Sequence, residues 1–487
     1  MITKEQYLAL DACAMAESLA AGDLTSSELM ECAIAQKEKV NGQLNAVNVD
    51  LSESAWNHAQ QADKETGRNQ HTPFLGIPFL IKDLTDLKGA QITHGSRLYT
   101  TSSKNGPVIS DQNAKVVKRY LDSGLLMLGK TNTPEFGLSV STEPVANGPC
   151  ANPWHTDYST GGSSGGAAAA VAAGIVPVAH ATDAGGSIRI PASCCGLLGL
   201  KPSRGLVVSD DDMLANRSGL TVNHVLSRSV RDSASFLDIV RLRKPELFPL
   251  PDVPQDLTEA SQQIPGPLRI MLQTEHPFGE SIDEDCLRAV TTLASCCESL
   301  GHKIEDMSAQ PDYRAAARAM NKILCAHTFQ QVRTRLQVLD ISLEQADLET
   351  STRQMTEAGS RITAADYAEA LTTLDRIREE MRQLFCSSDL LLSPVLAKTP
   401  ARLGWLNMNA NSLEDYAARY RCYSGFTPLA NGAGLPSLSI PAVSTSEGLP
   451  VGAMFTGAWG SDLILLKLAY QIEQTQPWPM LAPIAND

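Results

Sequence analysis

Residues 161–166 read Gly-Gly-Ser-Ser-Gly-Gly, and this glycine-serine cluster begins the stretch that carries the chemistry of the chain. An alanine-rich run follows at residues 167–173, and a second cluster, Asp-Ala-Gly-Gly-Ser-Ile-Arg, occupies residues 183–189. Glycine lacks a Cβ, so both clusters let the backbone approach a ligand closely and turn N–H groups inward, where they stabilise a developing anion. The alanine run favours a helix whose N-terminal amides converge on the first cluster. Each cluster therefore places a serine near unpaired backbone donors.

Two common kinds of glycine-rich loop fit residues 161–166 less well. Neither phosphate-binding pattern, G-x-x-x-x-G-K-[ST] or G-x-G-x-x-G, occurs there. Residues 161–165 match G-x-S-x-G, the nucleophile elbow of α/β-hydrolases, but any run of Gly and Ser satisfies that pattern. Such a hydrolase also needs an acid and a histidine downstream, and four later histidines have no distinctive context: His224, His276, His302 and His327.

The whole stretch closely resembles the amidase signature family. That family has Gly-Gly-Ser-Ser-Gly-Gly, a helix of small residues, Asp-x-Gly-Gly-Ser-Ile-Arg, Cys-Gly and Gly-x-Lys-Pro in this order. Ser163 and Ser187 stand 24 residues apart, as the two catalytic serines of the family do. Upstream, Leu-Gly-Ile-Pro-Phe-Leu-Ile-Lys-Asp at residues 75–83 matches the lysine strand of the family and puts Lys82 at the end of a buried strand. The resemblance runs from about residue 5 to Trp478.

The resemblance implies an α/β fold, in which a single large domain has a mixed β-sheet core flanked by helices on both faces. Residues 1–487 would form this one domain, although the length alone also allows two or three. We expect residues 1–60 to supply N-terminal helices packed on the body, and residues from about 245 to 390 to form a variable, mostly helical region on the substrate side.

Periodicity and capping signals place the other elements. Thr25 and Glu28 fit a capping box. Apolar spacing predicts helices over residues 5–20, 25–40, 111–123, 285–300, 313–339, 364–384 and 462–472, and strands over residues 76–81 and 125–128. The Pro-rich, polar residues 244–267 are expected to form a surface excursion.

By the resemblance, Ser187 would be the nucleophile, Ser163 a bridging proton relay and Lys82 the base. Burial of the lysine would favour this chemistry, because desolvation disfavours the ammonium and lowers its pKa. The oxyanion would be held by backbone N–H groups of the second cluster: Ala184, Gly185, Gly186 and Ser187. Ala184 stands where many relatives have Thr or Ser, but its backbone donor is unaffected.

Several residues compete with these assignments or add to them. Lys130 and Lys201 are rival bases, for which surface or loop-tethering roles are expected, and Ser164 could be mistaken for the relay. Asp183 and Arg189 are expected to hold the loop. Cys325 falls about where 6-aminohexanoate cyclic dimer hydrolases, members of the family, have a pocket cysteine, so it is a candidate substrate-binding residue with a core role as the alternative.

Composition limits the partners. A net charge of -14 and a pI near 5.2 argue against direct binding to nucleic acid or to an anionic membrane. No signal peptide is visible, and eleven cysteines without C-x-x-C spacing suggest reduced thiols rather than disulfides or a zinc site, so we expect a cytoplasmic protein without metal or cofactor. The expected partner is a small-molecule amide; the oligomeric state stays open, with a homodimer as one option.

The sequence thus predicts an amidohydrolase that cleaves a carboxamide C–N bond through a Ser-Ser-Lys triad and an acyl-enzyme. Its substrate would be a small, linear or cyclic amide. One alternative is the glutamine-hydrolysing A subunit of a tRNA-dependent amidotransferase, although the arginine-bearing glutamine pocket of those subunits is not recognised in residues 350–400. Another is a non-catalytic binding or scaffold protein, against which the intact triad argues.

Overall fold

A mixed β-sheet forms the centre of the protein. The computed structural model describes residues 2–64, 72–100, 106–209, 217–307, 310–409 and 412–486. Within these residues eleven strands pair in the order β1-β3-β2-β6-β8-β7-β12-β13-β11-β9-β10. They are β1 Val47–Asp50, β2 Pro78–Lys82, β3 Leu126–Thr131, β6 Val178–Asp183, β7 Leu198–Lys201, β8 Val222–Ser227, β9 Arg269–Leu272, β10 Lys303–Asp306, β11 Leu390–Pro394, β12 Ser437–Ser444 and β13 Pro450–Gly457. A separate hairpin pairs β4 (Ala151–Asn152) with β5 (His155–Ser159).

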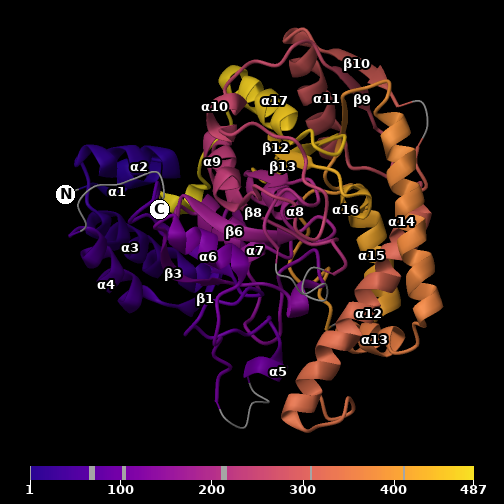
Figure 1. Cartoon of the computed structure of the whole chain (residues 1–487), viewed down its shortest axis with the longest axis horizontal. Coiled ribbons are helices and arrows are strands. Elements are labelled where there is room, and N and C mark those ends of the chain that lie inside the picture. The colour runs from indigo at the N-terminus through magenta and orange to yellow at the C-terminus, as the bar shows by residue number, and fades with distance from the viewer. Residues whose placement is uncertain are drawn as a thin grey trace.

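Helices cover this sheet (Figure 1). The described α-helices are α1 Lys4–Ala9, α2 Ala12–Ala21, α3 Ser26–Leu44, α4 Ser52–Ala62, α5 Arg97–Thr100, α6 Lys115–Asp122, α7 Gly165–Ala172, α8 Arg189–Cys195, α9 Val230–Val240, α10 Leu257–Ser261, α11 Glu284–Ser299, α12 Tyr313–Leu339, α13 Thr350–Gly359, α14 Ala364–Leu384, α15 Leu413–Tyr423, α16 Pro428–Ala433 and α17 Asp462–Thr475.

Strand direction decides where the residues singled out from the sequence meet. β2 runs parallel to both β3 and β6, whereas β8 is antiparallel to β6. The carboxyl ends of β2 and β6 therefore lie at the same edge of the sheet. Lys82 ends β2 and Asp183 ends β6, so the lysine strand and the second glycine cluster open on the same side.

Two helices show that the sheet is covered on both faces. In β2, Phe79 stacks on Phe236 of α9 with ring centroids 5.7 Å apart. Lys82, three residues later, reaches Ser164 at the start of α7. Side chains alternate along a strand, so residues 79 and 82 point to opposite faces. α9 and α7 thus lie on opposite sides of the sheet, as the family resemblance implied.

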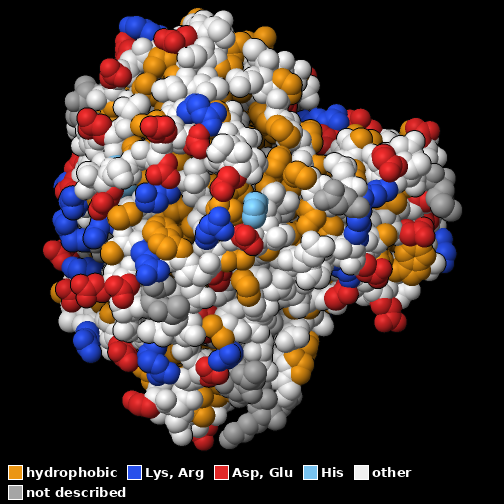
Figure 2. Space-filling view, turned by 180° about the vertical axis from the view of Figure 1, so that it is seen from behind, with side chains coloured by type: hydrophobic (Ala, Val, Ile, Leu, Met, Phe, Trp, Pro, Cys, Tyr) orange, Lys and Arg blue, Asp and Glu red, His pale blue; other side chains and the backbone are white. Residues whose placement is uncertain are grey.

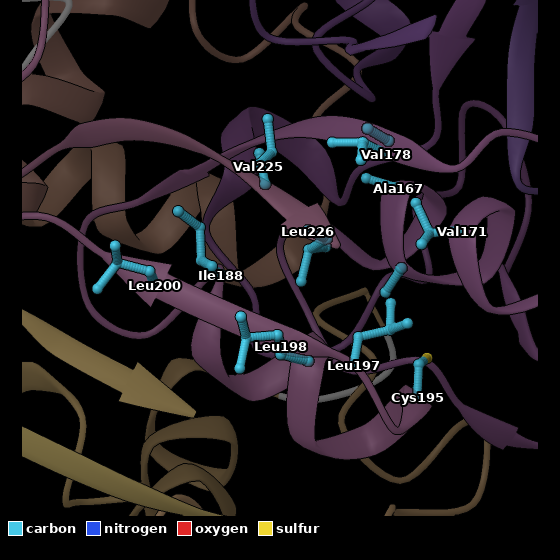
Figure 3. Packing of buried hydrophobic residues seen from close by; sticks show 14 of the residues in the cluster. Ala167, Val171, Val178, Ile188, Cys195, Leu197, Leu198, Leu200, Val225 and Leu226 are labelled. Atoms are coloured by element: carbon cyan, nitrogen blue, oxygen red, sulfur yellow. The ribbon is translucent and has the colours of Figure 1, made fainter. Parts of the chain in front are cut away.

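The alanine run forms α7, which is buried along its whole length. Small residues are required there, because a Cβ on Gly166 would lie 2.6 Å from the carbonyl oxygens of Ala46 and Asn132. Ala167 and Val171 of this helix pack near Val178 of β6, in the cluster shown in Figure 3. A larger side chain in α7 would therefore overpack the core beside the first glycine-serine cluster.

The N-terminal helices differ in one respect from expectation. The helix expected over residues 5–20 is two helices, α1 and α2, because the side chain of Asp11 caps the second by accepting from the Ala14 N–H. Arg231 holds that carboxylate in place from α9. The capping box of Thr25 and Glu28 at the start of α3 is confirmed.

The segment expected to form a surface excursion, residues 244–267, also contains a short helix that packs on the body of the protein. Residues 244–267 are mostly irregular, but α10 lies within them and packs on α9 and α17. Leu257 is buried, and the carboxylate of Asp238 accepts from its backbone N–H at 2.9 Å. This short helix was not predicted, because its apolar residues are too few to form a helical pattern.

The three helices α12, α13 and α14 pack together at the side of the molecule away from α1 to α4 (Figure 1). α12 and α14 match the ranges predicted from periodicity, and α13 was not predicted.

Among the described helices, none has the combination of length and apolar character that crossing a bilayer requires. On the face shown in Figure 2, acidic, basic and hydrophobic side chains are mixed.

Candidate active site

Lys82 lies at the centre of a buried cluster of hydroxyl groups. Its side chain is 0% exposed, and its Nζ contacts Ser163 Oγ at 2.7 Å, Ser164 Oγ at 2.8 Å and Thr182 Oγ1 at 3.0 Å. These partners come from the first glycine-serine cluster and from β6, next to β2 in the sheet. The fold thus brings together the lysine and the first serine that the sequence singled out.

The surroundings of Lys82 disfavour its charged form. Burial lowers its pKa well below the ordinary value, and the positive charge of Arg217 lowers it further, while the carboxylate of Asp183 acts in the opposite direction. A neutral amine has a free lone pair and can accept a proton from a hydroxyl group. The site therefore provides the electrostatic condition for lysine to act as a base.

Ser164 has contacts that suit it to holding Lys82 rather than to relaying a proton. Its hydroxyl donates to the carbonyl oxygen of Thr182 at 3.2 Å, and its oxygen accepts from the Thr182 N–H at 3.4 Å and from Lys82. Its only proton is thus directed to a backbone carbonyl. Ser163 makes no comparable bond within the described residues, so its proton is available to the amine.

The glycines of the first cluster allow neighbouring backbone to come very close. A Cβ on Gly162 would lie 2.7 Å from the Ser139 carbonyl oxygen and 2.8 Å from the Ser141 nitrogen. Thr133 Oγ1 donates to the Ser163 carbonyl oxygen at 3.0 Å. The loop is therefore fixed on several sides, which orients Ser163 toward Lys82.

The second cluster is organised by Asp183. Its carboxylate accepts from the N–H groups of Gly186 at 2.7 Å and Ile188 at 3.1 Å, and from Arg189 through Nε and Nη2, each at 3.0 Å. Burial alone would raise the pKa of Asp183, but the charge and hydrogen bonds of Arg189 hold it well below its usual range. Asp183 and Arg189 hold this loop, as expected.

The same bonds narrow the set of oxyanion donors. The Gly186 N–H, one of the expected donors, is already engaged by Asp183. The N–H groups of Ala184, Gly185 and Ser187 donate to no described residue, and these three residues are partly exposed. The N–H groups of Ala184, Gly185 and Ser187 are therefore the main candidates for binding the oxyanion. The Gly186 N–H could contribute only if it donated to Asp183 and to the oxyanion at the same time.

The two clusters lie against each other through α8. A Cβ on Gly161 would lie 3.1 Å from Ile190 Cγ2 and from Cys194 Sγ, both on the helix that follows Ser187. In the described part of the chain no hydrogen bond joins the side chains of Ser163 and Ser187, and Ser187 remains partly exposed. Ser187 is thus the more accessible of the two serines.

The rival lysines are not surface residues, contrary to one of the two roles expected for them. Lys130 is buried in β3, where its Nζ pairs with Asp83 Oδ1 at 2.7 Å. Lys201 is buried at the end of β7, and its Nζ donates to the Pro202 carbonyl oxygen at 2.7 Å. Burial also lowers the pKa of Lys201. Neither ammonium contacts Ser163, so tethering is the role that their contacts support.

Cys325 lies in α12 at its contact with α13. It is 3% exposed, and its nearest polar partner is Asn321 Oδ1, 3.8 Å from Sγ. Burial raises the pKa of its thiol to about 11, and Gly359 of α13 packs against its backbone. These contacts are those of a core residue, and its substrate-binding role stays a prediction.

Two contributors to the site were not recognised from the sequence. Thr182 contacts Lys82, and its place one residue before Asp183 could have suggested this. Arg217 donates from Nη2 to the Phe136 carbonyl oxygen at 2.7 Å. The next residue, Gly137, is so close to Ser163 that a Cβ on it would lie 3.3 Å from Ser163 Oγ. No sequence motif marks Arg217.

A buried histidine lies beside Lys82. Nδ1 of His180, in β6, accepts from the Lys82 N–H at 3.4 Å, and burial lowers the pKa of His180 to about 3, so the ring is neutral. Within the described ranges, no three or more His, Cys, Asp and Glu side chains are arranged to hold a metal ion.

A large mixed sheet flanked by helices is the fold of the amidase signature enzymes. The sequence model of the Amidase family matches residues 28–466, and the chain belongs to this family. It is 33% identical over 489 residues to the 6-aminohexanoate-cyclic-dimer hydrolase of Paenarthrobacter ureafaciens, covering 97% of this chain and 96% of that protein.

Solved structures agree with this assignment. The structure of 6-aminohexanoate cyclic dimer hydrolase superposes with a TM-score of 0.90 at 31% identity and covers 99% of both chains. A bacterial aryl acylamidase of the amidase signature family gives a TM-score of 0.86 at 26% identity and covers 98% of both chains. The protein is an amide-hydrolysing enzyme.

Proposed function

We propose that the protein hydrolyses the C–N bond of a small carboxamide through Lys82, Ser163 and Ser187, with an acyl-enzyme on Ser187. The observation that carries the proposal is the 2.7 Å contact between Lys82 Nζ and Ser163 Oγ in a site that lowers the pKa of the lysine. A lysine whose neutral form is favoured and that contacts a hydroxyl group is what activating a serine without histidine requires.

In the first half-reaction, neutral Lys82 accepts the proton of Ser163 while Ser163 accepts that of Ser187. Ser187 Oγ then forms a bond to the carbonyl carbon, and the carbonyl electrons move to the oxygen. The N–H groups of Ala184, Gly185 and Ser187 would stabilise this oxyanion, and one such donor is typically worth about 3 kcal/mol.

The C–N bond then breaks, and the relay returns the proton from Lys82 through Ser163 to the departing amine. This leaves an ester between the acyl group and Ser187. In the second half-reaction water, deprotonated by the same relay, attacks the ester carbon and Ser187 leaves with a proton. The cycle consumes one amide and one water and restores the neutral lysine.

The proposed substrate is a small linear or cyclic amide. Its support is the similarity to a 6-aminohexanoate-cyclic-dimer hydrolase over nearly the full chain. The similarity to an aryl acylamidase adds anilides as a second substrate type.

The eleven cysteines are free thiols, which is typical of a reducing compartment, and we propose a cytoplasmic location on that ground.

Two measurements test the proposal. A serine-reactive fluorophosphonate should label Ser187, and peptide mapping should find the adduct there; an adduct on Ser163 or Ser164 would overturn the assignment. A hydrolysis screen should then compare primary amides, anilides, glutamine and cyclic 6-aminohexanoate amides. Turnover of glutamine alone would favour the amidotransferase alternative, and no turnover with an unlabelled enzyme would favour a non-catalytic role.

A further inference from the structure

The peptide group that joins Gly185 to Gly186 is held at both of its polar atoms. The Thr427 hydroxyl donates to the Gly185 carbonyl oxygen at 2.7 Å, and the Gly186 N–H donates to Asp183 Oδ1 at 2.7 Å. A peptide group is planar, so fixing its oxygen and its hydrogen fixes its orientation. The direction in which the chain leaves toward Ser187 is thus set by one carboxylate and one hydroxyl group.

Thr427 is itself held firmly. It is buried, and its own carbonyl oxygen accepts from Arg189 Nη1 at 2.9 Å. Arg189 in turn pairs with Asp183. Thr427 therefore contacts the loop on two sides, through its hydroxyl group before Ser187 and through its carbonyl group after it.

Asn431, one turn further along α16, strengthens this attachment. Its Nδ2 donates to the Asp183 carbonyl oxygen at 3.0 Å and to Asp183 Oδ1 at 2.9 Å. Its Oδ1 accepts from Arg189 Nη2 at 2.6 Å. α16 and the residue before it thus bind the second cluster at Gly185, Asp183 and Arg189.

α16 also packs on the helices of the region expected to face the substrate. Its apolar residues form one buried cluster with residues of α12 and α14: Leu429, Ala430 and Ala433 with Tyr313, Ala316, Ile377 and Met381. A Cβ on Gly432 would lie 3.1 Å from Leu374 Cδ2 of α14, so the packing is close. Thr427 therefore directly precedes a helix that is packed in the core.

We propose that Thr427 is a positioning residue for the catalytic loop. Its hydroxyl group keeps the Gly185–Gly186 peptide in the one orientation that turns the N–H groups of Ala184, Gly185 and Ser187 toward the reacting carbonyl. Thr427 acts through the loop and needs no contact with substrate. This role rests on the proposed function, because it takes Ser187 as the nucleophile.

The space around the loop indicates why a hydroxyl group is needed there. Gly186 has φ +134°, and a Cβ on it would overlap Thr427 Oγ1 and lie 2.8 Å from Ile190 Cδ1, so no side chain at this position could take over the role of the hydroxyl group. Replacing Thr427 by Val keeps the volume but removes the donor. The peptide then loses one of its two attachments, and small displacements of a reacting group or a lost donor typically reduce rates by about 100-fold.

The test uses the full-length enzyme and the Thr427→Val variant. We expect kcat to fall 10- to 100-fold with KM changed less than twofold, and the rate of fluorophosphonate labelling to fall by a similar factor. Thr427→Ser, which retains the hydroxyl group, should recover kcat to within about threefold. A matched control is Thr356→Val, because Thr356 is equally buried and donates to the Thr352 carbonyl oxygen at 2.8 Å in α13.

The outcomes separate this inference from the proposed function. If wild-type enzyme is labelled on Ser187 but Thr427→Val keeps its kcat and labelling rate, the positioning role is wrong and the proposed function stands. If Thr427→Val and Thr356→Val lose activity equally, with equal loss of thermal stability, Thr427 is only a core residue. If the label lies on another serine, both the proposed function and the positioning role are wrong.

Discussion

The carboxylate of Asp183 and the guanidinium group of Arg189 form a bidentate ion pair that is fully buried. Nε and Nη2 of Arg189 each donate to one carboxylate oxygen at 3.0 Å. The pair encloses the loop that carries Ser187, since the two residues lie on either side of it. Breaking such a pair leaves a buried charge without its partner, which is far more costly than breaking an exposed pair.

Asp183→Asn should therefore destabilise the protein by about 3 kcal/mol and slow labelling of Ser187. Chemical denaturation measures the first effect. Because the folded-state pKa of Asp183 is depressed, its contribution to stability is present at neutral pH and is lost only in acid below the usual carboxylate range. The control is Glu379→Gln, whose partner Arg382 is exposed. Equal stability of Asp183→Asn and wild type would contradict the role given to the pair.

Arg217→Gln should move the pH profile of kcat/KM to higher pH. The positive charge of Arg217 lowers the pKa of Lys82, so its removal raises that pKa and leaves less neutral amine at a given pH. Activity should fall near neutrality and recover as the pH rises. Arg335→Gln is the control, since Arg335 also donates to a backbone carbonyl, that of Leu98, but does not act on Lys82. An unchanged inflection in Arg217→Gln would refute the electrostatic effect.

Lys130→Met should reduce stability by about 3 to 5 kcal/mol, because it leaves the carboxylate of Asp83 buried without its ion-pair partner. The folded fraction should still be labelled on Ser187. The double variant Lys130→Met with Asp83→Asn should recover part of the stability, and a double-mutant cycle measures the coupling. A stable Lys130→Met protein that cannot be labelled would instead make Lys130 a candidate base.

Cys325→Ala tests the one predicted substrate contact outside the two clusters. If the thiol reaches the substrate, KM or substrate preference should change while the labelling rate of Ser187 does not. If the residue only fills the core between α12 and α13, the variant should unfold at a lower temperature and show unchanged kinetics on every amide in the screen.

The local parts of this site could be predicted from the sequence. The apolar run before Lys82 and the alanine run after Ser164 each specify one element, and both elements form where expected. Local patterns also give the order of Asp183, the two glycines and Ser187. These features depend on residues that are near one another in the chain.

The missed features depend on distant partners. Lys130 looked like a loop residue because the apolar run ends at residue 128, yet β3 continues to Thr131 since Asp83 neutralises the lysine inside the fold. Thr427 lies 242 residues from Gly185, whose carbonyl oxygen it binds. Spacing and periodicity carry no information about such contacts.

The role of Lys82 as the base is tested most directly by the amidase rate of Lys82→Arg across pH. Guanidinium retains the charge and the approximate length of lysine but does not deprotonate in this range. We expect a folded protein whose kcat is reduced about a thousandfold or more, whereas wild-type activity rises through one ionisation well below the free-lysine value of about 10.4. A folded Lys82→Arg variant with a near-normal rate would show that Lys82 is a structural cation and that the Ser-Ser-Lys mechanism is wrong.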